Sequence, residues 1–86
     1  MEHDAQAQQI DRVSSNIART VIEYLRLQMR YYGGDFTSFE LTSYVMTHAG
    51  CSPGSPVRIL RKLREDGEID YKVTDRSRSR YVVTRV

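Results

Sequence analysis

The side chains best suited to binding chemistry in this sequence are arginines, and they gather in two short stretches. The first stretch contains two serines and covers residues 52–66, and the second is a polar run over residues 75–80. Hydroxyl groups near a helix start suit phosphate oxygens, and a guanidinium can donate two hydrogen bonds to one guanine edge. The candidate binding residues are therefore Ser52, Ser55, Arg58, Arg61, Lys62, Arg76, Arg78 and Arg80.

Residues that would support catalysis or metal binding are sparse. His48 and Cys51 have a metal-like spacing, but a zinc site needs about four ligands, and the other histidine is His3 at the start of the chain. Cys51 has no second cysteine to pair with, which excludes an internal disulfide and fits a reducing compartment. We find no glycine-rich phosphate loop and no suitable carboxylate pair, so the sequence predicts neither an enzyme nor a cofactor.

Length and composition indicate one small soluble domain. The 86 residues are 40% hydrophobic and 28% charged, which is typical of a globular protein with a thin core. No apolar run approaches the ~20 residues of a membrane span. The polar, acidic start lacks the features of a signal peptide. We therefore expect a cytoplasmic protein that does not bind membranes.

The charge is unevenly distributed along the chain. Residues 1–50 carry four basic and six acidic residues, whereas residues 51–86 carry nine basic and five acidic residues. The overall net charge of +2 therefore conceals a basic C-terminal half. This asymmetry favours a polyanionic partner for that half.

Hydrophobic spacing predicts a first helix that ends at Gly33 and Gly34. A start near Ser14 or Ser15 would leave residues 1–13 as a tail. A start nearer Asp4 would make them a helix extension that could carry a homodimer contact. The apolar positions, three or four residues apart, are Ile10, Val13, Ile17, Val21, Tyr24, Leu25 and Met29.

Two shorter helices are predicted next. Thr37 and Glu40 match a capping box for a helix from Ser38 to about His48, which Gly50 would end. Its candidate buried residues are Phe39, Leu41, Tyr44, Val45 and Ala49. The third helix would have Ser55 as its cap, Pro56 in its first turn and Gly67 just past its end. Its apolar positions are Val57, Leu60 and Leu63, with Ile59 beside them.

After Gly67 the hydrophobic period changes from helical to alternating, which predicts an antiparallel hairpin. Its strands would be residues 69–74 and 80–86, joined by the polar run 75–79. Because an isolated hairpin is barely stable in water, residues 35–37 could add a third, edge strand. In the first strand Ile69, Tyr71 and Val73 alternate with polar residues, and in the second strand Tyr81 and Val83 are predicted to face inward.

This order of elements resembles the winged helix-turn-helix family over residues 14–86. The segment from Val57 to Ile69 is similar to the part of MarR-type regulators that runs from the second helix of the motif into the wing. The segment from Asp75 to Thr84 is similar to their wing, although Ser77 and Ser79 stand where basic residues are common. We therefore assign the chain to the broad winged-helix class.

The resemblance implies an α+β fold with three helices and a C-terminal β-hairpin, the wing. It also implies that the protein binds double-stranded DNA in a sequence-specific manner and is a small transcriptional regulator. Residues 55–66 would lie in the major groove, and residues 75–80 would lie beside it.

The alternative is a protein-interaction module in a transcription or replication complex, because a fold does not fix a function. A continuous positive face would favour DNA, and an interrupted one would favour a protein partner. The acidic residues able to interrupt it are Glu65, Asp66, Glu68 and Asp70.

Overall fold

A computed structural model describes the backbone of residues 2–86 and the side chains of residues 15–86. Over this part of the chain the elements are α1 (Glu2–Tyr32), β1 (Asp35–Thr37), α2 (Ser38–Ala49), α3 (Ser55–Glu65), β2 (Asp70–Asp75) and β3 (Arg80–Arg85). The predicted α+β class, with three helices and a C-terminal hairpin, is confirmed for these residues. Ile10 and Val13 lie outside the described side chains, so a homodimer contact there stays a prediction.

The first helix, α1, begins at Glu2 and thus takes the longer of the two lengths left open by the sequence. It ends as predicted at a glycine pair, with Gly33 at φ 64° and Gly34 at φ 88°. The Gly34 carbonyl accepts a 2.9 Å hydrogen bond from the Val83 N–H. A Cβ atom at Gly34 would lie 2.6 Å from the Val83 carbonyl oxygen. Glycine is therefore needed for the end of α1 to meet β3.

The second helix, α2, is capped by Thr37, whose Oγ1 accepts the Glu40 N–H at 3.1 Å. The Glu40 carboxylate accepts the Thr37 hydroxyl at 2.9 Å rather than the Thr37 N–H that the capping box predicts. Gly50 ends the helix at φ 64°, as predicted. The prediction that Phe39 is buried is wrong, because its side chain is 79% exposed. Leu41 fixes the buried side, and Phe39 lies two residues away, roughly 200° around the helix.

The third helix, α3, has Gly54 as its N-cap, so the prediction of Ser55 as the cap is wrong. Ser55 is the first helical residue and is only 7% exposed. At the other end, Gly67 adopts φ 77°. The N–H groups of Gly67 and Glu68 donate to the carbonyls of Arg64 and Leu63, both at 3.0 Å. This pair of bonds is a Schellman motif, which ends α3 and directs the chain into β2.

The three strands form an antiparallel sheet in the order β1-β3-β2. The predicted edge strand at residues 35–37 is confirmed, since Phe36 pairs with Tyr81 of β3. In the hairpin, Tyr71 pairs with Val83 and Val73 pairs with Tyr81. Val73 is nevertheless 43% exposed, although it alternates in step with the buried Tyr71. It borders an open cavity between α3 and the hairpin instead of packing in the core.

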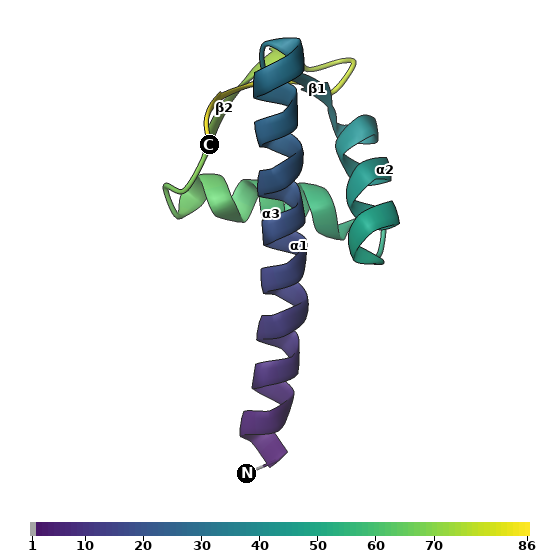
Figure 1. The fold of residues 1–86 in the computed structure, drawn as a ribbon, viewed down its shortest axis with the longest axis vertical. Coiled ribbons are helices and arrows are strands. Elements are labelled where there is room, and N and C mark those ends of the chain that lie inside the picture. Colours follow the sequence, from purple (N-terminus) through teal and green to yellow (C-terminus); the bar gives the residue numbers. More distant parts are fainter. Residues whose placement is uncertain (1) are drawn as a thin grey trace.

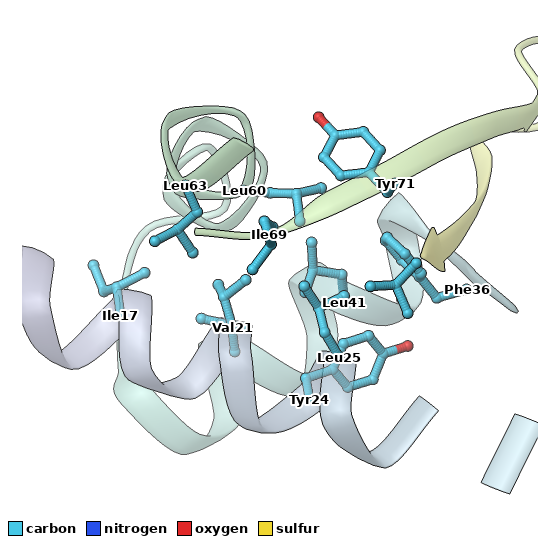
Figure 2. Packing of buried hydrophobic residues seen from close by; sticks show 12 residues of the cluster. Ile17, Val21, Tyr24, Leu25, Phe36, Leu41, Leu60, Leu63, Ile69 and Tyr71 are labelled. Atoms are coloured by element: carbon cyan, nitrogen blue, oxygen red, sulfur yellow. The ribbon is translucent and has the colours of Figure 1, made fainter. Parts of the chain in front are cut away.

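The core lies where the C-terminal half of α1 meets the other helices and the sheet. In Figure 1, α3 crosses α1 steeply, α2 lies to one side, and the strands gather near the C-terminal end of α1. Figure 2 shows the apolar side chains of these elements pointing toward one another. The buried set is Ile17, Val21, Tyr24, Leu25, Phe36, Leu41, Val45, Leu60, Leu63, Ile69, Tyr71 and Val83.

Candidate nucleic-acid interface

The sequence of α3 gives this helix an apolar back and a cationic front. Leu60 and Leu63 are buried in the core. Arg61 and Lys62 lie between the two leucines in the sequence, Arg58 precedes them, and all three cations are exposed. Because residues three apart share a helix side, the packing of the two leucines turns these cations toward solvent. The core thereby positions the candidate binding residues.

A cavity of about 410 Å³ lies between α3 and the hairpin. Its cationic lining comes from Arg61 and Arg64 of α3 and from Arg76 in the hairpin tip, residues 75–80. Its apolar lining is Val57, Leu60, Tyr71, Val73 and Tyr81. The fold therefore brings Arg61 and Arg76 to one concave surface, although they belong to different elements.

Arg64 is a residue of this surface that the predicted set omits. Its guanidinium carbon lies 4.6 Å from the centroid of the Tyr71 ring, and its Nε lies 3.3 Å from a carboxylate oxygen of Asp70. These contacts hold the guanidinium against β2 at the edge of the cavity. The basic character of α3 was visible in the sequence, but the contacts with β2 depend on how the helix and hairpin pack.

A second hollow, of about 330 Å³, runs along the front of α3. Its lining includes three of the predicted residues, Arg58, Arg61 and Lys62, together with Glu65. The Lys62 amino group lies 3.3 Å from a carboxylate oxygen of Asp66. The acidic residues thus interrupt the positive surface toward the C-terminal end of α3.

The hairpin tip is organised around Asp75, which the predicted set also omits. Its Oδ1 accepts the Ser77 hydroxyl at 2.7 Å and the Arg78 N–H at 3.3 Å. The hydrogen bond from Ser77 is the main cause that lowers the pKa of the Asp75 carboxyl below its usual range. Arg78 Nε lies 3.7 Å from the other carboxylate oxygen. Asp75 therefore shapes the tip and also offsets the charge of Arg78.

A backbone hydrogen bond joins the hairpin tip to the helices. The Ser38 N–H at the start of α2 donates to the Ser79 carbonyl at 3.0 Å. Ser79 itself adopts φ 50°, in the left-handed region that residues other than glycine rarely occupy. The Ser79 N–H also donates to the Arg76 carbonyl at 3.3 Å, so Ser79 links the tip to the start of α2.

Besides Arg78 of the tip, three predicted residues, Ser52, Ser55 and Arg80, line neither of these two cavities. The Ser55 hydroxyl is buried and lies 2.9 Å from the hydroxyl of Ser52, which is exposed. Arg80 lies next to Tyr81 on β3, and neighbouring residues of a strand point to opposite faces. Its Nε lies 3.8 Å from a carboxylate oxygen of Asp35, and it lines a different cavity.

Within residues 15–86, Arg58, Arg61 and Arg76 have no carboxylate oxygen within 4.0 Å, whereas four other cations do. The paired cations are Lys62, Arg64, Arg78 and Arg80. The charge of three arginines on α3 and the tip is therefore not offset by a carboxylate within 4.0 Å in this part of the chain.

Comparisons of the chain with protein-family models, with curated proteins and with solved structures gave no match. In the described part of the chain, no three His, Cys, Asp or Glu side chains are grouped so that they could hold a metal ion. No helix in that part is both long and apolar enough to cross a membrane. Function must therefore be inferred from the geometry and charge of α3 and the hairpin.

Proposed function

We propose that this chain is a winged-helix protein that binds double-stranded DNA in a sequence-specific manner and regulates transcription. The arrangement of three helices and a three-stranded sheet is compatible with that fold. The observation that carries the proposal is the shared cavity of Arg61 and Arg76, which presents cations from α3 and from the hairpin tip on one surface. A DNA backbone that passes between helix and hairpin would contact both.

In this proposal α3 lies in the major groove with the hairpin tip as the wing. Arg58 is exposed near the start of α3, where recognition helices contact base edges, and its planar guanidinium suits guanine. Arg61 and Arg76 would bind phosphate oxygens. Lys62 and Arg78 would reach phosphates only by leaving Asp66 and Asp75, and ion pairs exposed to solvent in this way are weak.

The second candidate is a protein-interaction module, and a specific observation favours it. Asp66, Asp70 and Asp75 interrupt the positive surface by pairing with neighbouring cations. A protein partner that offers carboxylates beside hydrogen-bond donors would match such a mixed surface better than a uniform polyanion would.

The test is a fluorescence-anisotropy titration of random-sequence and genomic DNA duplexes at two salt concentrations. We expect binding at low salt that weakens as salt rises, since phosphate contacts release counterions. Selection from the random pool should then enrich a defined sequence. Absence of binding at low salt would overturn the proposal, and nuclease-insensitive capture of a protein partner would then support the interaction module.

A further inference from the structure

A separate cavity, of about 570 Å³, lies away from the two on α3 and is formed by the end of α1, strand β1 and the start of α2. None of its lining residues lines the cavity between α3 and the hairpin. Its volume falls within the roughly 300–1,000 Å³ of small-molecule sites. This cavity is therefore separate from the proposed DNA-binding surface.

Aromatic side chains form much of the wall of this cavity. Tyr32, in the last turn of α1, is 68% exposed, and Phe39, in the first turn of α2, is 79% exposed. Tyr44 lies deeper, with its ring centroid 5.0 Å from that of Tyr24. Large aromatic side chains left in water at one concave site are an unused binding surface, and their ring faces attract cations.

The charged groups of the cavity favour a cation as well. Asp35 and Glu40 contribute two carboxylates, against a single cation, Arg80. Arg80 lies near Asp35, at 3.8 Å, whereas Glu40 makes no ion pair among the described residues. Burial raises the pKa of the Tyr24 hydroxyl above its usual range, and the negative charges of Glu40 and Asp35 raise it further. The field at this site is therefore negative.

An unused hydrogen-bonding group lies beside these charges. Tyr24 lines the cavity, its side chain is only 6% exposed, and its hydroxyl oxygen is buried with no hydrogen-bond partner in the described part of the chain. An unpaired buried hydroxyl costs free energy, and its lone pairs can accept a hydrogen bond from a ligand.

We propose that this cavity binds a small organic cation, an ammonium group attached to an aromatic or other apolar body. The ammonium group would donate to the Glu40 carboxylate and to the Tyr24 hydroxyl. The apolar body would pack on Tyr32 and Phe39. A neutral compound of the same shape would lose the charge attraction of Glu40 and of the ring faces, and an anionic one would be repelled by Glu40.

The test is an NMR titration of the whole chain with the 2-phenylethylammonium ion, with 2-phenylethanol and phenylacetate as neutral and anionic analogues. Saturable shifts around residues 32–44 are expected with the ammonium ion alone. Equal binding of the three compounds, or shifts confined to α3, would overturn the proposal. Shifts at the same residues that depend on protein concentration, without added compound, would mean that a second copy covers the cavity, and they would overturn it too.

Two variants locate the contacts. Glu40→Gln and Tyr24→Phe should each weaken binding of the ammonium ion by about fivefold or more. Glu65→Gln, on the exposed front of α3, is the matched control and should leave the affinity unchanged. Tyr24→Phe removes only the unpaired hydroxyl, so a thermal unfolding curve should show that this variant still folds. Unchanged affinity in both variants would contradict the assignment.

Discussion

Arg61 in α3 and Arg76 in the hairpin tip line the same cavity, although a turn and a β-strand separate them along the chain. Neither guanidinium has a carboxylate partner within 4.0 Å among residues 15–86. The two cations therefore share a surface because α3 and the hairpin border one cavity, with Arg64 of α3 in contact with Tyr71 and Asp70 of β2. The helix and the hairpin therefore present their cations on one surface, on which the proposed DNA binding depends.

Arg58→Ala should relax the choice of DNA sequence. If Arg58 contacts a guanine edge, its loss should cost about 1–3 kcal/mol on the preferred site and much less on random DNA. The measurement is the ratio of the two affinities at one salt concentration.

Arg26→Ala is the control for that substitution. Arg26 is an exposed arginine on α1 that lines neither cavity of the candidate DNA-binding surface. The Arg26→Ala variant should leave both affinities unchanged. An Arg58→Ala variant that loses affinity equally for all sequences would show that Arg58 contacts phosphate and not a base.

Gly34→Ala should destabilise the fold by about 1–3 kcal/mol, because alanine would be strained at a positive φ and its Cβ would meet the Val83 carbonyl oxygen. Gly54→Ala is the control, since Gly54 has a negative φ and open space around it. It adds neither backbone strain nor a steric clash, so it should cost clearly less than Gly34→Ala. Urea unfolding curves measure both, and equal losses would contradict the close approach of α1 to β3.

Much of the fold could be predicted because its elements begin and end through local chemistry. Thr37 and Glu40 cap α2 through bonds between near neighbours, and Gly50 and Gly67 end their helices at positive φ. These signals lie within a few residues of the structure they specify. The sequence pattern also indicated the edge strand at residues 35–37, because an isolated hairpin needs a partner.

The candidate site was predicted less well, because its geometry depends on contacts between distant segments. The serines and arginines were chosen by residue type, yet Ser55 is buried and Arg80 lines the other cavity. Arg64 was omitted, since its contacts with Tyr71 and Asp70 exist only once the hairpin packs on α3. Residue type predicted which side chains suit an anion, and tertiary packing decides which of them share a surface.

Tyr24→Phe should reduce the fall in the free energy of unfolding that occurs as the pH becomes alkaline. Burial raises the pKa of Tyr24 in the folded protein above the value of about 10 in an unfolded chain. The part of the free energy of unfolding that depends on a protonated Tyr24 is fully present below pH 10. It is lost as pH rises from there toward the folded pKa, because the unfolded chain releases the proton first.

The free energy of unfolding, measured by urea denaturation between pH 8 and pH 11, should therefore fall less steeply for Tyr24→Phe than for the natural sequence. Tyr31→Phe is the control, because Tyr31 is exposed, and it should follow the natural sequence. Identical slopes for all three proteins would contradict the burial of the Tyr24 hydroxyl.

The most direct test of the shared surface is the salt dependence of DNA binding for Arg61→Ala, Arg76→Ala and the double variant. Each single substitution should weaken binding to all sequences and reduce the slope of log affinity against log salt by about one, and the double variant by about two. Arg26→Ala should leave the slope unchanged. If Arg61→Ala lowers the slope while Arg76→Ala behaves like Arg26→Ala, helix and hairpin do not bind DNA together, and the central claim is wrong.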